Sequence, residues 1–429
     1  MTRPARSGRP ARLLATVAGL LLSLAACTTG QTPSAPVGST AVAVSPPPAG
    51  ATAPATAAVD TPRPTADTPA PAAPVDREVV LAVSRDLVSG EQDPFFAHSS
   101  TMTWESLVAL DDQLNPVPQL AESWDLSADG TTWTFKLRSG VRFSDGTPFD
   151  ADAVVANVQR YLRISPRPSP FFTLNARQAF GDLVEVAALD DLTVVFRHNA
   201  PNPSMPFTMS NFFSAMYSPN SFAENGDFAG TPATTGPFVI AEWQRGQYVR
   251  LDRNEAYWGA KPAVRQIRLR VLPDSGARVS ALLAREVDGV VELGALLPSQ
   301  AKDLEGRAGI TVGADPISIS QFLAFNCSRP PFDNADLRRA VALAIDREAV
   351  VRSLVLGYGV AGQSLLSPFA PQWLSPKGRP AHDPAEARDL ARAALGDRRV
   401  SATLIFAGGA GQARPYRALA ELFQSQLAP

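Results

Sequence analysis

Only a few side chains in this 429-residue sequence have the types and spacing that catalysis needs. The pairs Asp111-Asp112 and Asp190-Asp191 are adjacent carboxylates, a type of group that general acid–base chemistry uses. Both pairs lie at expected turns, where aspartate is common because its side chain bonds to the nearby backbone. The motifs of a nucleophile elbow, a zinc peptidase, a phosphate-binding loop and a dithiol site do not occur in the sequence. We therefore expect that the protein is not an enzyme, and a hydrolase is the alternative from that class.

Residues that bind metals are also sparse. The histidines, His98, His198 and His382, are too scattered to match a metal-ligand spacing. The cysteines, Cys27 and Cys327, are too few for a disulfide framework, and Cys327 is expected to be a single buried thiol. The sequence therefore predicts neither a metal site nor a cofactor.

The charge balance excludes some classes of partner. A formal net charge of −2, with 45% hydrophobic and 19% charged residues, describes an ordinary soluble protein and argues against binding to nucleic acid. The basic residues are nearly all arginine. Arginine binds carboxylates through two hydrogen bonds, so this excess could signal anion recognition. The simpler explanation is a genome rich in arginine codons, because proline and alanine are abundant as well.

The first residues have the pattern of a secretory signal. Arginines precede an apolar run, Leu13–Leu24, that is too short to span a bilayer. The run ends in Leu24-Ala25-Ala26-Cys27, which resembles the lipobox of bacterial lipoproteins. We expect a signal peptide over 1–26, cleavage before Cys27 and acylation of Cys27, which would anchor the chain to the membrane. An ordinary signal peptide without acylation is the alternative.

A linker is expected over 27–77, after the signal. Proline, alanine, threonine, serine and valine dominate this segment, and it has no aromatic residue. Such a composition cannot bury enough apolar surface to fold. Because proline favours an extended backbone, roughly 3.1 Å per residue gives a reach on the order of 100 Å. The sequence therefore predicts a disordered tether between the membrane anchor and the folded part.

The most informative stretch runs from Gln119 to Leu162 and predicts a strand, a turn and a helix. Large apolar residues alternate with polar ones over 133–138, which is typical of a half-buried strand. Ser144-Asp145-Gly146 predicts a turn, and Asp150 is expected to cap the helix. One helical stripe contains Val154, Val158, Tyr161 and Leu162.

Other elements before residue 274 follow from the same periodicities. A buried strand is expected over 78–83, followed by a helix that carries Met102, Leu107 and Leu110. Two strands should surround the Asp190-Asp191 turn. The segment 203–222 is rich in methionine and phenylalanine, so it is expected to lie in the core. Residues 264–274 predict a further alternating strand.

The C-terminal part should begin with a helix. Its inward residues are expected to be Val279, Leu282 and Leu283. A short valine-rich strand over 287–291 comes next, and a later strand should end at Asn326. A helix lined by Leu337, Val341 and Ile345 is expected after that strand, with Asp346 capping the helix that follows.

The order of residues over 119–162 closely resembles that in the extracytoplasmic solute-binding proteins of peptide and nickel ABC importers, known as family 5. Two further stretches carry the same resemblance. One joins Thr235-Gly236-Pro237-Phe238 to Asn254-Glu255-Ala256-Tyr257-Trp258, and the other covers 322–351. Arg285-Glu286 stands where the family has Gly-Glu, which is a mild departure.

The resemblance implies an α/β, two-lobed periplasmic-binding-protein-like fold of class II type, with the extra small subdomain of the peptide-binding family. Lobe I would cover 78–270, including the small subdomain at about 114–190, and lobe II would cover 271–429. Family members usually continue beyond the equivalent of Pro429, so lobe II is expected to be C-terminally incomplete. In peptide-binding relatives an acidic residue in that later part holds the α-amino group of the ligand.

The resemblance also suggests ligand-binding residues. The loop after the first strand faces the cleft in this family, which makes Phe95, Phe96, Met102 and Trp104 candidates, although each could instead belong to the core. Further candidates follow from loop position. Phe325 and Asn326 end the strand of the last match, and Pro368 and Phe369 lie in a loop that commonly borders the cleft in this family.

A proline-punctuated loop contributes further candidates from its own chemistry. Arg163, Arg167 and Phe171 could grip a carboxylate and stack on a planar group. A solvated loop with an aromatic plug is the alternative.

The function implied by the resemblance is that of a substrate-binding lipoprotein. It would capture a peptide or similar small solute between its lobes and deliver it to an ABC permease, as a monomer outside the cytoplasm, in the periplasm or at the cell surface. Import of a nickel chelate is the alternative, because Leu296-Leu297-Pro298 and the loop 367–371 look like the nickel-binding member. A purely structural surface protein would have no ligand at all.

Overall fold

The computed structural model describes residues 77–86, 103–111, 114–164, 182–210, 214–292, 294–314, 320–362, 382–406 and 415–428, together with Phe180. Within these residues, no helix combines the length and the apolar character that crossing a membrane requires.

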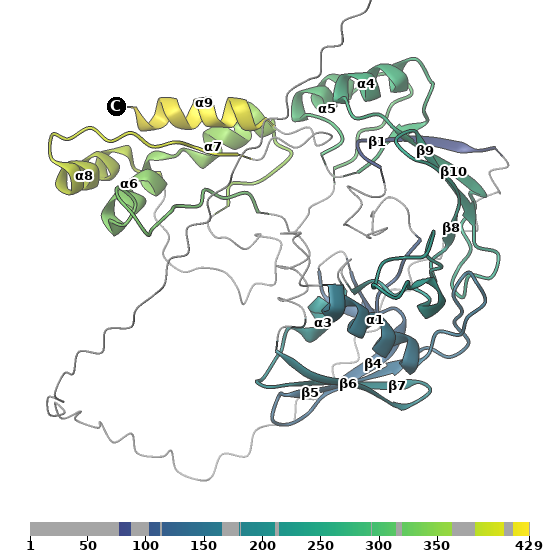
Figure 1. Cartoon of the computed structure of the whole chain (residues 1–429). Helices are drawn as coiled ribbons and strands as arrows, with labels where there is room; N and C mark the ends of the chain where they lie inside the picture. Colours follow the sequence, from purple (N-terminus) through teal and green to yellow (C-terminus); the bar gives the residue numbers. More distant parts are fainter. Residues whose placement is uncertain are drawn as a thin grey trace, which may run out of the picture. The chain divides into compact units, whose positions relative to one another are not determined.

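A five-stranded mixed sheet contains the first strand of the described chain (Figure 1). Its strands are β1 (Val79–Val83), β8 (Phe238–Gln244), β9 (Tyr248–Arg253), β10 (Gln266–Val271) and β11 (Gly289–Val290), in the order β11-β1-β10-β9-β8. β1 runs parallel to both β10 and β11, whereas β8, β9 and β10 are antiparallel neighbours. Gly246, with a φ of 71°, turns the chain between β8 and β9.

The two faces of this sheet differ because its strands alternate. On β9, Val249 and Leu251 are buried in a hydrophobic cluster with Leu269 of β10, and the residues between them point to the other face. That other face is covered near β1 by helix α4 (Ser275–Leu283), where Ala281 packs with Ala82. Further from α4, the face is polar.

A second sheet is entirely antiparallel. Its strands are β4 (Ala121–Leu126), β5 (Thr132–Leu137), β6 (Leu183–Asp190) and β7 (Thr193–His198), in the order β4-β5-β7-β6. Helix α1 (Ala151–Ile164) packs on β6 and β7, and Val154 and Val158 lie in one core with Phe135 and Phe196. The Asp150 carboxylate accepts a hydrogen bond from the Ala153 N–H at 2.9 Å, which confirms the predicted cap.

Shorter elements complete this core. Strands β2 (Val108–Leu110) and β3 (Pro116–Pro118) form an antiparallel pair, and α3 (Met205–Thr208) and η3 (Pro219–Ser221) lie in the methionine-rich segment. Met205, Met209 and Met216 are fully buried. The prediction that this segment belongs to the core is therefore confirmed for its described methionines.

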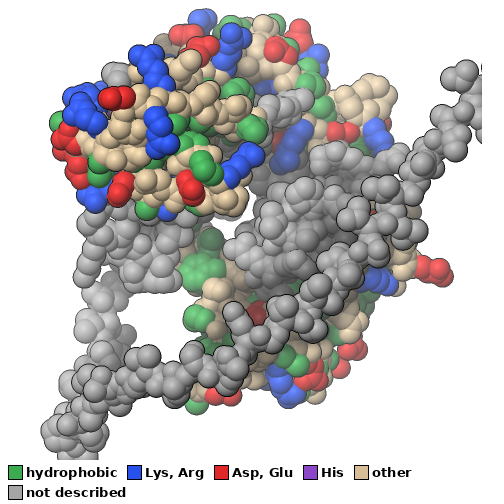
Figure 2. All heavy atoms as spheres, turned by 60° about the vertical axis from the view of Figure 1, so that its left-hand side comes forward, with side chains coloured by type: hydrophobic (Ala, Val, Ile, Leu, Met, Phe, Trp, Pro, Cys, Tyr) green, Lys and Arg blue, Asp and Glu red, His purple; other side chains and the backbone are tan. Residues whose placement is uncertain are grey.

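The described residues after β11 form helices and no strand. The helices are α5 (Pro298–Leu304), α6 (Ala335–Ala344), α7 (Arg347–Val350), η4 (Val351–Val355), α8 (Pro384–Leu395) and α9 (Tyr416–Leu427). α6 packs on α8, and Arg339 pairs with Glu386 between them. The predicted cap at Asp346 is confirmed, because its carboxylate accepts from the Ala349 N–H at 2.8 Å. Figure 2 shows basic and acidic side chains interspersed on the face it presents.

Two predicted elements are wrong. The helix expected to carry Leu107 and Leu110 is replaced by β2, because Asp111 turns the chain there and accepts a hydrogen bond from the Asn115 N–H at 2.8 Å. The strand expected to end at Asn326 is absent, since residues 320–326 form neither helix nor strand. Cys327, which follows that segment, is exposed, so the prediction of a buried thiol is also wrong.

Two predicted inward leucines point outward instead. Leu162 is 39% exposed, because it lies at the edge of the buried arc of α1 and that arc is centred near Asn157 and Tyr161. Leu283 is 44% exposed, because α4 buries Arg278 and Ala281 on its inner face. In both helices a buried arginine, Arg160 in α1 and Arg278 in α4, occupies a position that the predicted apolar stripe would assign to the surface.

Candidate functional site

Glu105 carries a buried carboxylate and lies, in the sequence, between β1 of the five-stranded sheet and β4 of the antiparallel sheet. It joins segments that are far apart in the sequence. The residue is 3% exposed. One carboxylate oxygen accepts a hydrogen bond from the Tyr257 hydroxyl at 2.9 Å, and the other accepts from the Trp258 Nε1–H at 2.9 Å. Burial raises the pKa of Glu105 above its ordinary value, although these donors and Arg138 act in the opposite direction.

Asn254 organises the segment that supplies those two donors. Its backbone N–H donates to the Pro237 carbonyl at 2.8 Å, and its Nδ2 donates to the Gly236 carbonyl at 3.0 Å. The Asn254 side-chain oxygen accepts from the Ala256 N–H at 3.0 Å, which turns the chain toward Glu105. The Thr-Gly-Pro and Asn-x-x-Tyr-Trp motifs, separate in the sequence, therefore form one cluster around Glu105.

The same cluster fixes the position of Trp104. On one side of it, the Thr103 carbonyl accepts a hydrogen bond from the Gly236 N–H at 2.8 Å. On the other side, the Glu105 carbonyl accepts from the Met216 N–H at 2.8 Å. Trp104 is partly buried against the hydrophobic cluster of the five-stranded sheet. Its indole Nε1 is buried and has no acceptor among the described residues. A fixed aromatic side chain thus carries an unsatisfied donor.

A second buried carboxylate, Glu292, lies just after β11. Its side chain is 2% exposed and accepts hydrogen bonds from the Ser84 N–H at 2.9 Å and the Ser84 hydroxyl at 2.8 Å. The other carboxylate oxygen accepts from the Arg85 Nε–H at 2.8 Å. Glu292 therefore ties the residues that follow β1 to the residues that follow β11. Nothing in the local sequence pattern indicated this contact.

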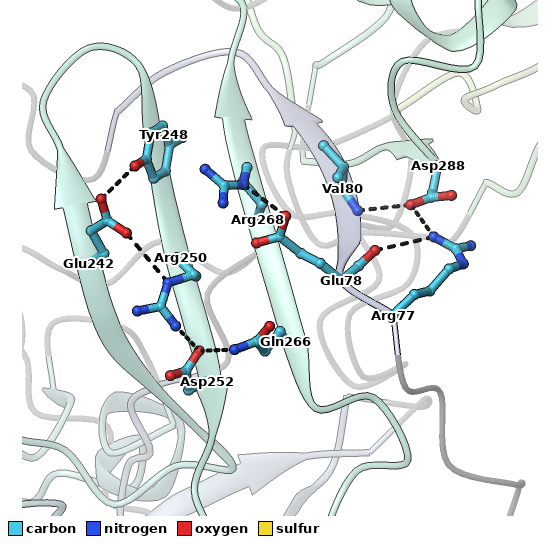
Figure 3. A network of polar contacts seen from close by, with 10 residues as sticks. All are labelled: Arg77, Glu78, Val80, Glu242, Tyr248, Arg250, Asp252, Gln266, Arg268 and Asp288. Carbon is cyan, nitrogen blue, oxygen red and sulfur yellow. Dashed lines mark hydrogen bonds and ion pairs between the residues drawn. The ribbon is translucent and has the colours of Figure 1, made fainter.

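The polar face of the five-stranded sheet carries a network of ion pairs (Figure 3). The network contains Arg77, Glu78, Val80, Glu242, Tyr248, Arg250, Asp252, Gln266, Arg268 and Asp288. Arg268 donates to Glu78 at 2.9 Å, and hydrogen bonds from Arg77 and the Val80 N–H lower the pKa of Asp288. A shallow pocket of about 330 Å³ lies at one end and is lined partly by Arg77 and Asp252. These charges pair with one another, so we assign the network to the sheet itself rather than to a ligand.

In the described part of the chain, no cluster of three or more histidine, cysteine, aspartate or glutamate side chains could hold a metal ion. His198 is buried on β7, and its Nδ1 lies 3.4 Å from the carboxylate of Asp182.

Most predicted site residues lie outside the described residues. These are Cys27, Phe95, Phe96, Met102, Arg167, Phe171, Pro368 and Phe369. Of the others, Arg163 is exposed in the last turn of α1. The Phe325 ring lies 4.9 Å from the ring of Phe332, and Asn326 accepts hydrogen bonds from Ser328 in a turn. The ring contact of Phe325 and the hydrogen bonds of Asn326 are with residues near them in the sequence and do not involve Trp104 or Arg163.

Comparisons with known proteins agree with this architecture. The family described as "Bacterial extracellular solute-binding proteins, family 5 Middle" matches residues 115–429. The glutathione-binding protein GsiB of Escherichia coli (strain K12) is 29% identical over 327 residues, which is 74% of this chain and 61% of that protein. The glutathione-binding protein of Pectobacterium atrosepticum is 29% identical over 328 residues, with the same shares. The chain thus spans about three fifths of the length of these curated relatives.

Solved structures show the same fold. NikA from Brucella suis, in complex with Fe(III)-EDTA, is 25% identical with a TM-score of 0.67, and the match covers 82% of this chain and 73% of that one. An ABC transporter substrate-binding protein from Sinorhizobium meliloti is 27% identical with a TM-score of 0.59, over the same shares. The predicted α/β fold of the periplasmic binding proteins is confirmed, and the matched proteins are solute-binding proteins of transport rather than enzymes. The chain belongs to the bacterial extracellular solute-binding proteins of family 5.

Proposed function

We propose that this protein is the substrate-binding component of an ABC importer, which captures a peptide or similar small solute and delivers it to a permease in the membrane. The observation that carries the proposal is the family match over residues 115–429. Relatives at 29% identity are named for binding glutathione, which is a small peptide.

Binding would act by a shift in population. If lobe I (78–270) and lobe II (271–429) both contact the solute only when they are closed, the solute stabilises the closed form. The closed form would then be the one that the permease receives. We propose that the protein works as a monomer, anchored outside the cytoplasm through a lipid on Cys27 and the tether over 27–77.

Import of a metal chelate is the second candidate. The structure of NikA from Brucella suis, with Fe(III)-EDTA bound, supports it through a similarity of 25% identity and a TM-score of 0.67. The two candidates differ in the ligand that they predict. A peptide binder takes its ligand without metal, whereas a chelate binder needs the metal together with a small organic chelator.

A thermal-shift screen of the purified full chain separates the candidates. One panel contains di- and tripeptides with glutathione, a second contains Ni²⁺ with L-histidine, and a third contains simple sugars as the control. A ligand at a hundred times its Kd stabilises the native state by about 2.7 kcal/mol, which raises the Tm measurably. Stabilisation by peptides alone supports the first candidate, and stabilisation by the nickel chelate alone replaces it with the second. If no panel raises the Tm, neither candidate stands.

A further inference from the structure

The carboxyl ends of the parallel strands meet at one edge of the five-stranded sheet. β1 is paired in parallel with β10 and β11, so the residues after these strands emerge side by side. Ser84 and Arg85 follow β1, Leu272 follows β10, and Glu292 follows β11. Ligands of open α/β sheets bind outside this edge, because the loops there diverge from the sheet and leave a crevice.

Glu292 is held at this edge in an unusual backbone conformation. Its backbone angle φ is 100°, a value that residues other than glycine rarely adopt. Strain of this kind persists where the surroundings fix it, and it is common at ligand-binding positions. Here the surroundings are the hydrogen bonds from Ser84 and from Arg85, together with the nearby positive charge of Arg278.

The two arginines near Glu292 are used differently. Arg278 is fully buried, and its Nε donates to the Ala295 carbonyl at 2.7 Å while its Nη1 donates to the carbonyls of Leu272 and Pro273. Its guanidinium therefore holds the loops behind the sheet edge. Arg85 instead has a side chain that is 49% exposed, and among the described residues its polar contact is with Glu292, which accepts from Nε.

This arrangement leaves one edge of the Arg85 guanidinium available. With Nε engaged by Glu292, the Nη1 and Nη2 groups make no hydrogen bond with any residue that the structure describes. Two parallel N–H groups match the two oxygens of a carboxylate, which is the geometry of the strongest arginine pairs. Arg278 and Arg85 both act on Glu292, so two cations face one carboxylate at this edge. Nearby Asp86 accepts from the Trp243 Nε1–H at 2.8 Å and the Gly246 N–H at 2.6 Å, so donors already engage its oxygens.

We propose that Arg85, held through its Nε by Glu292, binds a carboxylate of the solute with its Nη1 and Nη2 groups. This inference rests on the proposed function as a solute receptor and narrows it to solutes that carry a carboxylate. The strained Glu292 acts as a positioning residue, since it touches Arg85 and not the solute.

The test compares peptides that differ only at the C-terminal carboxylate. One pool contains tripeptides with uncharged side chains and a free carboxylate, and the matched pool contains the same peptides as C-terminal amides. Binding to the full chain is measured by calorimetry for the wild type, for R85Q and for the control R270Q. Arg270 is also a half-exposed arginine paired with a glutamate, Glu286, but it lies on the polar face of the sheet.

The expected result has three parts. The wild type binds the free acids more tightly than the amides, R85Q loses about 10- to 100-fold in affinity for the acids, and R270Q binds as the wild type does. R85K keeps the positive charge but lacks the paired N–H groups of a guanidinium, so its affinity for the acids should lie between those of the wild type and R85Q. It serves as the test variant if R85Q does not fold. Wild-type affinity in the Arg85 variants, or equal affinity of the wild type for acids and amides, overturns the assignment and leaves the receptor function intact. A wild type that binds neither pool overturns the proposed peptide ligand as well.

Discussion

Replacing Glu105 by alanine removes the acceptor of two hydrogen bonds and leaves the hydroxyl of Tyr257 and the indole N–H of Trp258 without a partner in a buried site. Each hydrogen bond to a charged acceptor contributes about 1.5–3 kcal/mol. The desolvation that raises the pKa of Glu105 offsets part of this sum, because the carboxylate is itself unfavourable where it lies. We expect E105A to lower the free energy of unfolding by about 2–4 kcal/mol, which is a large share of the stability of an ordinary domain.

The pH dependence gives a sharper test. The pKa of Glu105 is raised in the folded state, so its folded form takes up a proton more readily than its unfolded form. The stabilisation that goes with this proton is complete below the unfolded pKa and is lost as the pH rises through the folded pKa. E105Q does not titrate at this position. The stability of the wild type minus that of E105Q should therefore increase as the pH falls from 7 toward 4.5.

Urea unfolding at several pH values measures this difference. The matched control is E122Q, because Glu122 also contacts Arg138, at 3.5 Å, but its side chain is 53% exposed. We expect E122Q to change the unfolding free energy by less than about 0.5 kcal/mol. A wild-type advantage over E105Q that shrinks on acidification would refute the reasoning, since it would mean that the buried carboxylate is favoured in its charged form.

Three further predictions concern other parts of the chain. F135A should lower the unfolding free energy by about 3–5 kcal/mol, measured in urea, because Phe135 is fully buried and its ring meets that of Phe196 edge-on at 5.5 Å. D150A should cost about 1 kcal/mol in the same assay, since it removes the cap of α1, and D150N should restore most of it. C27S should move the protein from the membrane fraction to the soluble fraction on cell fractionation; an unchanged membrane fraction would count against the proposed lipid anchor.

The antiparallel sheet and α1 could be predicted because their signals are local. Trp133, Phe135 and Leu137 alternate within one strand, and all three are buried as expected. The cap at Asp150 lies one residue before the helix that it serves. Over such short distances, the period of the sequence reports directly on which face is buried.

The two buried carboxylates could not be predicted in the same way. Tyr257 and Trp258 lie 152 and 153 residues from Glu105, and Ser84 lies 208 residues from Glu292. Contacts at this separation leave no periodic trace in the sequence. Arg278 illustrates the same limit, because a rule that places arginine outside fails once backbone carbonyls satisfy the guanidinium in the interior.

The two buried carboxylates, Glu292 and Glu105, fix the chain at the two ends of one segment: Glu292 before it and Glu105 after it. Ser84 and Arg85, just after β1, are held by Glu292, and Thr103 to Glu105 are held by Gly236, Tyr257 and Trp258. Residues 87–102, which include the predicted ligand-binding residues Phe95, Phe96 and Met102, lie between these two anchored ends in the sequence. If that segment contacts the solute, releasing either end should weaken binding through the same residues.

A double-mutant cycle of E105Q and E292Q tests this reasoning. The two carboxylates share no partner among the described residues, so their effects on the unfolding free energy should add to within about 0.5 kcal/mol. Their effects on solute affinity should not add, because the two carboxylates hold the two ends of the same segment of the chain. Calorimetry of the four proteins with the solute found in the screen measures the second quantity, and urea unfolding measures the first. Strict additivity in affinity would show that the two ends act independently, and the 87–102 segment would then lose its place in the proposed binding site.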